Sequence, residues 1–180
     1  MADFMEIIKG RRAIRRFQAK AIPEDDLNTI LEAVRWAPSW ANTQCWEVIV
    51  VRDSGVKAKL EDTLSQGNPA RKAILEAPIV FALCGRLERS GYYKGQAKTK
   101  FGDWFMFDIG IATQNLCLTA HTLNMGTVIV GLLDQDKAGD MLGVPEGYAV
   151  VALIPIGYPA QEVEAPARRE ISEFVHYDRF

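Results

Sequence analysis

Residues 103–123 read DWFMFDIGIATQNLCLTAHTL, a stretch with the length of a long helix but without a polar face. Apolar residues fall on nearly every side of that helix, whereas a surface helix usually has one apolar stripe. The segment therefore has to be covered all round. Two arrangements would do this: a second copy of the chain supplies part of the cover, or the helix is the central core helix of a monomer.

The pattern of apolar residues and of Gly and Pro predicts the other elements of the chain. Expected helices span 3–9, 23–37, 56–64, 70–76 and 134–142, and expected strands span 46–51, 78–84, 126–131 and 148–156. Residues 39–44 and 91–102 are expected to be loops, and the tail from Gly157 is typical of an extended arm that docks on a neighbour. With no repeat or linker, residues 1–180 are predicted to form a single α+β domain with helices around one sheet.

The composition limits the possible partners and compartments. The chain has 180 residues and a net charge of −2, which argues against broad binding to nucleic acid or anionic membranes. No export signal or membrane-spanning run is visible, so we expect a cytoplasmic protein. Cys45, Cys84 and Cys117 are dispersed and are interpreted as reduced, buried thiols. Neither His121 nor His176 has metal-ligand spacing with them, and we expect His121 to be structural and no metal to be bound.

Four arginines lie within six residues, in the run Gly10-Arg-Arg-Ala-Ile-Arg-Arg-Phe17. Guanidinium groups match the oxygens of phosphate and carboxylate, and the apolar residues Ile14 and Phe17 could fix the run on a core. This pattern favours one anionic ligand in a fixed place, although a solvated loop with surface ion pairs is the alternative. Arg16 is expected to point to water. A second pair, Arg168 and Arg169, either binds the ligand or forms surface pairs with Glu170 or Glu173.

Several standard sites are missing from the sequence. There is no Gly-x-Gly fingerprint, no Gly-Lys-Ser/Thr phosphate loop and no Gly-x-Ser-x-Gly elbow. Early arginines, the polar loop after Pro38 and the late arginine pair remain. This combination suggests a tightly held phosphorylated cofactor that supplies the chemistry itself.

The order of these motifs resembles the nitroreductase family of FMN-dependent oxidoreductases, over nearly the whole chain. The matching segments are RRAIRRF at 11–17, APSWANTQCW at 37–46, DIG at 108–110 with QNL at 114–116, ALIPIGYP at 152–159 and EFVHYDRF at 173–180. The resemblance implies a nitroreductase-like fold: a central, mainly antiparallel sheet surrounded by helices, a long central helix at a dimer interface and an extended C-terminal arm. It also implies a homodimer with FMN sites at the interface.

The resemblance implies a reaction as well. NAD(P)H would be a transient electron donor, and hydride would pass through flavin N5 in ping-pong fashion to a small electron-poor acceptor of the nitroaromatic or quinone type. No catalytic side chain is nominated, and neither nucleic acid nor membrane is expected as a partner. Two rival hypotheses remain: a related flavoenzyme of the same fold with another substrate, or a non-enzymatic interaction protein with a basic loop.

By resemblance, each candidate site residue receives a role. Arg11 and Arg12, with Ala13 alongside, and Arg168 would bind the FMN phosphate, and Arg15 would lie near N1 and O2 of the flavin. Asn68 would face the polar edge of the flavin, and Val130 and Gly131 would lay backbone against it. The other subunit would contribute Pro38, Ser39, Trp40, Asn42 and Gln44, with Trp40 either a wall of the flavin pocket or an interface filler.

Three features depart from the family pattern. Ala13 stands where a serine is usual, and Pro166 stands where a lysine is usual. Phosphate binding would therefore depend on Arg11, Arg12 and Arg168. The chain is also short for the family and has little room for the extra helices that form part of the substrate channel in longer members.

Overall fold

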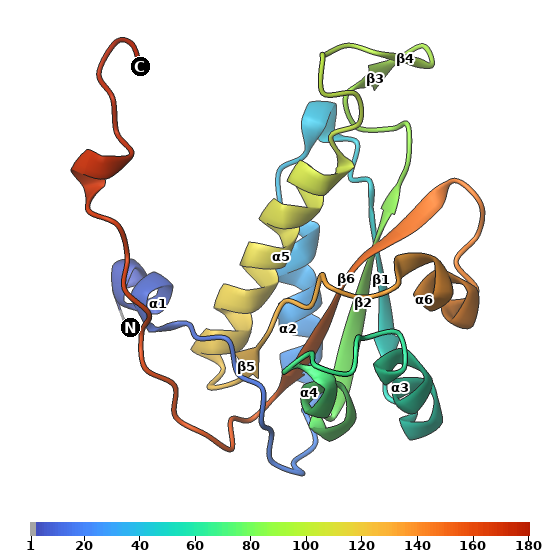
Figure 1. Ribbon diagram of the computed structural model, residues 1–180, viewed down its shortest axis with the longest axis vertical. Helices are drawn as coiled ribbons and strands as arrows, with labels where there is room; N and C mark the ends of the chain where they lie inside the picture. Colours follow the sequence, from blue (N-terminus) through green and yellow to red (C-terminus); the bar gives the residue numbers. More distant parts are fainter. Residues whose placement is uncertain (1–2) are drawn as a thin grey trace.

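A four-stranded antiparallel sheet lies at the centre of the protein, in the order β1–β2–β6–β5 (Figure 1). The computed structural model describes residues 3–180. The strands are β1 (Trp46–Val51), β2 (Ile79–Arg86), β5 (Gly126–Thr127) and β6 (Tyr148–Gly157). Strand β2 is buried along almost its whole length and pairs with both β1 and β6. The predicted runs at 46–51, 78–84 and 148–156 are thus confirmed as the three long strands.

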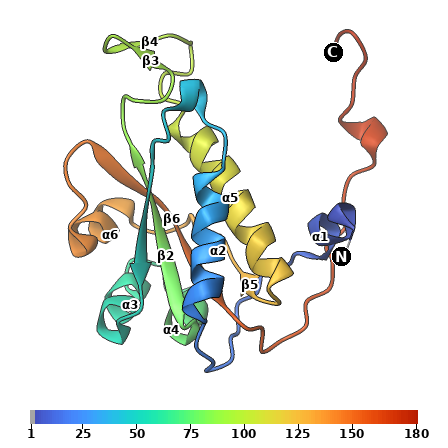
Figure 2. The same cartoon turned by 180° about the vertical axis from the view of Figure 1, so that it is seen from behind.

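Helices cover both faces of this sheet. On one face lie α2 (Glu24–Arg35) and α5 (Phe105–Thr122), and on the other lie α3 (Ser54–Glu61), α4 (Arg71–Glu76) and α6 (Gln135–Leu142) (Figures 1 and 2). Each face of the sheet has its own apolar core, and alternate residues of β2 pack into the two cores. Phe81 packs on the α2–α5 side, whereas Val80 and Ala82 belong to the core on the opposite face. Side chains of a strand alternate between the faces, so one apolar strand supplies both.

Helix α5 is only half covered by its own chain. Ile109, Ala112 and Leu116 are buried on the side that faces the sheet and α2. Met106 and Phe107 are 57% and 59% exposed. The expectation of an apolar helix is confirmed. One chain thus leaves two large apolar side chains of this helix exposed.

The two ends of the chain project from the sheet. The short helix α1 (Phe4–Gly10) and the arm after Gly157 run beside one another, and the arm, with the 3₁₀ turn η2 (Ile171–Glu173), leads away from the body (Figures 1 and 2). Apolar side chains remain exposed along both segments: Phe4, Met5, Ile8, Ile171, Phe174, Tyr177 and Phe180. The expected extended arm is therefore present.

The structure also corrects three expected boundaries. The strand predicted at 126–131 is reduced to the two residues of β5, after which only Val130 bridges to Leu153. The loop expected at 91–102 contains a small hairpin of β3 (Tyr92–Tyr93) and β4 (Gln96–Ala97). Helix α3 begins before the expected Val56, because the side chain of Asp53 caps it by accepting from Val56 N at 2.8 Å. Within residues 3–180, no helix has the length and apolarity needed to cross a membrane.

Candidate functional site

The arginine run is fixed along the edge of the sheet. Ile14 N donates to Thr127 O at 2.9 Å, and Ala13 and Thr127 form a parallel bridge beside β5. Ile14 and Phe17 are each 6% exposed, as expected of residues that fix the run on the core. Gly126 makes this close approach possible, because a Cβ there would lie 2.4 Å from the Ile14 side chain.

Arg11 and Arg12 line a pocket of about 290 Å³ at the C-terminal end of α5, which we call the arginine pocket. Arg12 Nη1 donates to the carbonyls of Lys9 and Arg11, at 2.5 and 2.9 Å. His121 and the first residues of the arm also line the pocket, including Gln161 and Glu162. Two guanidinium groups beside one opening suit an anionic group such as phosphate.

His121 lines the arginine pocket beside the two arginines. Its ring packs on Gly10, where a Cβ would come within 2.6 Å of Nε2. Burial, followed by the charges of Arg11 and Arg12, lowers the pKa of His121. The ring thus fills space between the arginines and the helix, which agrees with the structural role expected for it.

Arg15 and Arg16 differ in whether their side chains have a hydrogen-bond partner. Arg15 Nε is buried and has no hydrogen-bond partner among residues 3–180. Buried donors are nearly always paired in folded proteins, so an unpaired one is unusual. Arg16 is exposed, as expected, and its Nε lies 3.0 Å from Glu76 Oε2 in a surface ion pair between the arginine run and α4.

Val130 belongs to the same core as Ile14 and Phe17 of the arginine run, and Asn68 contacts the segment just after Gly131. The Asn68 amide donates to Leu132 O at 3.0 Å and accepts from Ala70 N at 2.9 Å, so it shapes the loop that follows Val130. Val130 is buried, whereas Gly131 is exposed and a Cβ there would meet no atom within 4 Å. Open space at Gly131 leaves its backbone accessible to a flat ligand.

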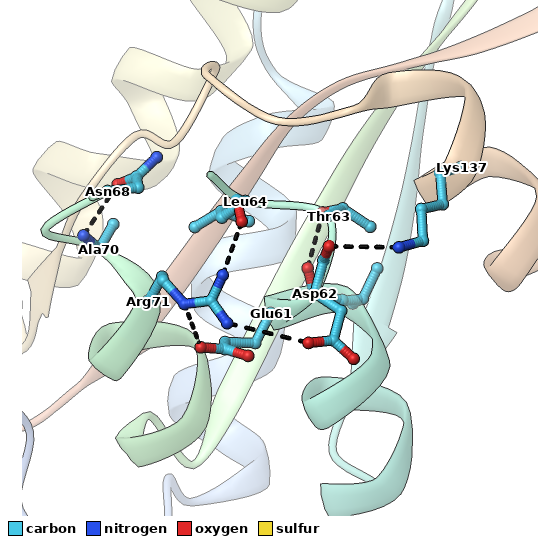
Figure 3. A network of polar contacts seen from close by, with 9 residues as sticks. Glu61, Asp62, Thr63, Leu64, Asn68, Ala70, Arg71 and Lys137 are labelled. Atoms are coloured by element: carbon cyan, nitrogen blue, oxygen red, sulfur yellow. Dashed lines mark hydrogen bonds and ion pairs between the residues drawn. The ribbon is translucent and has the colours of Figure 1, made fainter. Parts of the chain in front are cut away.

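A polar network holds the Asn68 segment in place (Figure 3). Arg71 Nε lies 2.5 Å from Glu61 Oε1, and Arg71 Nη1 donates to Leu64 O at 2.7 Å. Lys137 on α6 donates to Asp62 O at 3.3 Å. The network ties α3, α4 and α6 together under the turn that contains Asn68.

The loop Pro38–Gln44 forms the second group of candidate residues. Its backbone is strained, because Ala41, Asn42 and Gln44 have φ values of 44°, 55° and 47°. Positive φ is uncommon outside glycine and tends to occur at functional sites. Ser39 Oγ accepts from Gln44 N at 2.9 Å, and Gln44 Nε2 donates to Asn42 Oδ1 at 3.2 Å. Thr43 Oγ1 is the other buried side-chain atom without a partner among residues 3–180.

Asp108 holds this loop, a role that the sequence reasoning missed. Its buried carboxylate accepts from Trp40 N at 3.1 Å, from Ser90 Oγ at 2.6 Å and from Cys45 Sγ at 3.5 Å. Burial and Asp108 raise the pKa of Cys45 to about 12, so this thiol is inert. The sequence feature that could have revealed this role is an acidic residue inside an otherwise apolar helix.

The structure does not bring the two groups of candidate residues together within one chain. The arginine pocket adjoins the C-terminal end of α5, and the Pro38–Gln44 loop adjoins its N-terminal end (Figure 1). Helix α5 has 18 residues, which corresponds to a length of about 27 Å. Within one chain the two groups of residues are therefore separate.

Arg168 also lies apart from the arginine pocket in this chain. It is on the exposed arm, where Nη1 donates to the carbonyls of Pro166 and Ala167 at 3.1 and 3.3 Å. The adjacent Arg169 donates to the carbonyl of Glu173, so it makes a local contact on the arm. The phosphate role of Arg168 stays a prediction.

Known proteins are similar to this chain in sequence and in fold. A model of the nitroreductase family matches residues 8–158. A relative from Methanothermobacter thermautotrophicus, provisionally named an NADH dehydrogenase/NAD(P)H nitroreductase, is 29% identical, over 94% of this chain and 82% of its own. The NADPH-flavin oxidoreductase of Vibrio harveyi is 28% identical, over 100% of this chain and 75% of its own.

A solved structure extends the likeness to three dimensions. The FMN-dependent nitroreductase of Clostridium difficile has a TM-score of 0.81 at 24% identity, and the match covers 97% of this chain and 99% of that one. This structure has the same α+β fold. Because the family model spans most of the sequence, the chain belongs to the nitroreductase family.

Proposed function

We propose that this protein is an FMN-dependent oxidoreductase that uses NAD(P)H to reduce small electron-poor acceptors of the nitroaromatic or quinone type. Membership of the nitroreductase family supports an oxidoreductase, as do the printed names of the relatives. The structural observation that carries the proposal is the buried Arg15 Nε, a donor without a partner in the described residues, close in sequence to the arginine pocket.

The residues present fit FMN. The arginine pocket would hold the phosphate through Arg11 and Arg12, with Arg168 reaching it from the arm. Arg15 would supply a fixed positive charge for the pyrimidine edge, and the open space at Gly131 would leave room for a flat ring. FMN supplies hydride and electron transfer when it is bound. The chain's own residues bind and orient it.

The overall reaction balances without a protein acid or base. A nitro group takes up two electrons and two protons to give a nitroso group and water. NAD(P)H supplies the hydride and becomes NAD(P)⁺, and the solvent supplies one proton. A quinone would become a hydroquinone in the same way. Donor and acceptor would use one place in turn, which agrees with the absence of a Gly-x-Gly nucleotide fingerprint in the sequence.

We also propose a homodimer with two sites, each built from the arginine pocket of one copy and the Pro38–Gln44 loop of the other. Exposed apolar side chains on α1, α5 and the arm support it, because water-exposed surface of this kind usually marks an interface. Three buried, unpaired cysteines suit the reducing cytoplasm that we propose as its location.

Purified protein tests both parts of the proposal. We expect a yellow protein that releases FMN on denaturation and oxidises NAD(P)H when a nitroaromatic or quinone is added. Light scattering on dilute protein should give the mass of a dimer. A colourless protein that takes up no FMN would contradict the function and favour the non-enzymatic interaction protein. A stable, folded monomer at nanomolar concentration would contradict the two-subunit site.

A further inference from the structure

An aromatic pocket lies at the N-terminal end of α5, at the opposite end of the helix from the arginine pocket. It has a volume of about 320 Å³ and is lined by Pro38, Ser39, Trp40, Trp104, Phe107, Asp108 and Ile111. The ring centroids of Trp40 and Trp104 are 5.2 Å apart, and those of Trp104 and Phe107 are 5.4 Å apart. Walls made of three packed rings suit a flat aromatic ligand.

The β3–β4 hairpin is attached to the same tryptophan that forms this pocket. Trp104 N donates to Ser90 O at 3.0 Å, and Trp104 Nε1 donates to Thr99 Oγ1 at 2.7 Å. Gly91 has a φ of +80°, and a Cβ there would lie 2.6 Å from the Trp104 ring. The hairpin lies at the N-terminal end of α5 (Figure 1), and its flanking residues are hydrogen-bonded to Trp104 of the pocket wall.

The hairpin and its flanks have a local positive charge. Residues 90–102 contain Lys94, Lys98 and Lys100 and no acidic residue, in a chain of net charge −2. All three lysines are exposed, and none has an ion-pair partner within the described part of the chain.

The lysines continue the aromatic cluster outward from the pocket. Lys100 Nζ lies 4.9 Å from the centre of the Phe101 ring, and that ring lies 6.2 Å from Trp104. Lys94 and Lys98 Nζ lie 5.5 and 5.7 Å from the Tyr93 ring, farther along the hairpin. Contacts with aromatic faces hold ammonium groups at defined places without neutralising them.

We propose that the aromatic pocket binds the electron acceptor and that the lysine hairpin selects acceptors bearing a carboxylate or sulfonate. The preferred substrate class is then a flat, electron-poor aromatic anion. This inference rests on the proposed function, in which the Pro38–Gln44 loop contributes to the site where the acceptor is reduced. Exposed lysines attract an anion through water over about a Debye length, near 8–10 Å, so direct contact with the ligand is not required.

Two probes of similar shape separate the effect of ligand charge from the effect of ligand shape. They are 4-nitrobenzoate, an anion, and 4-nitrobenzamide, its neutral counterpart. We expect the double variant K98Q/K100Q to raise KM for the anion about threefold to tenfold at low salt and to leave KM for the amide within about twofold. High salt should shrink the difference. The double variant K59Q/K72Q removes the same charge from exposed positions on α3 and α4 and should change neither value.

Binding without turnover supplies a second measurement. Quenching of tryptophan fluorescence gives the dissociation constants of both probes without NAD(P)H, and Trp40→Phe should weaken the quenching. The inference is overturned if the anion-to-amide ratio is equal in the wild type and in K98Q/K100Q, or if only KM for NAD(P)H changes. A protein that reduces neither probe and takes up no FMN refutes the proposed function instead, and the binding ratio still decides the charge preference.

Discussion

The carboxylate of Asp108 on α5 accepts a hydrogen bond from the backbone N–H of Trp40, at 3.1 Å to Oδ1 and 3.2 Å to Oδ2. The same group accepts from Ser90 Oγ at 2.6 Å, just before the lysine hairpin. One buried side chain thus fixes the strained loop, the base of the hairpin and the start of the long helix.

Asp108→Asn should loosen this junction. The Asn side chain loses the charge-assisted hydrogen bonds, and its NH₂ group, a donor, faces donors such as the N–H of Trp40 and the hydroxyl of Ser90. This change should lower the free energy of unfolding by roughly 1–3 kcal/mol. FMN affinity should fall as well, since the loop that we assign to the cofactor of the other subunit depends on this contact. Urea unfolding and FMN titration measure both effects. Asp140→Asn, on the exposed side of α6, is the matched control, and equal behaviour of the two variants would contradict the role given to Asp108.

Arg15→Gln should lower the midpoint potential of the flavin while FMN still binds. A positive charge near N1 and O2 stabilises the anionic reduced form more than the oxidised form. Losing about 1–2 kcal/mol of this difference corresponds to roughly 20–40 mV for a two-electron couple. Hydride uptake from NAD(P)H should slow, and reoxidation by a good acceptor should not. An anaerobic redox titration is the measurement, and an unchanged potential at normal FMN occupancy would show that Arg15 points elsewhere.

Arg168→Ala should weaken FMN retention more than Arg169→Ala does. A lost charge-assisted contact with phosphate should cost roughly 1.5–3 kcal/mol, or about 10- to 100-fold in affinity. Pro166 stands where a lysine is usual, so little nearby can compensate. Titration of the two apo-variants with FMN compares them directly. Equal affinities would mean that the phosphate lies elsewhere.

Stability should fall in mild acid because of His121. Burial and the two neighbouring arginines lower the pKa of this ring from its usual 6.5, so the folded state resists protonation. The unfolded chain then binds more protons below about pH 6.5, and the free energy of unfolding decreases as the pH falls from there toward the pKa of the folded state. His121→Gln should flatten this decrease in urea unfolding, and His176→Gln on the arm should not. A pH dependence identical in both variants would refute the assignment.

Most of the fold could be predicted from the spacing of apolar residues and from the positions of Gly and Pro in the sequence. The strand at 148–156 is a continuous apolar run, and the strand at 46–51 is apolar apart from Glu47. The helix that opens after Pro23 has apolar residues at helical spacing, and these are the residues that it buries. The short strand β5 is different. Its two residues, Gly126 and Thr127, pair with Gly157 and Ile156 of β6, which is a contact between parts of the chain about 30 positions apart. Single-sequence reasoning has no access to such contacts.

The candidate site was predictable to the extent that its residues are local. Ile14 and Phe17 fix the arginine run as expected, whereas Arg16 pairs with Glu76, a residue 60 positions away. Asp108 was recognised only as part of a motif, since its partners Trp40 and Ser90 come from two other segments. The resemblance supplies roles for Arg15 and Arg168 that chain geometry alone does not test.

The length of α5 has a genetic consequence. The arginine pocket and the Pro38–Gln44 loop adjoin opposite ends of an 18-residue helix, so in the proposed dimer each site draws one part from each copy. A chain damaged only in its pocket and a chain damaged only in its loop would each be inactive alone. Mixed at random in equal amounts, about half of their dimers combine both kinds of chain, and each of these holds one intact site. Two defective alleles would therefore complement one another and restore about a quarter of the sites of the normal protein.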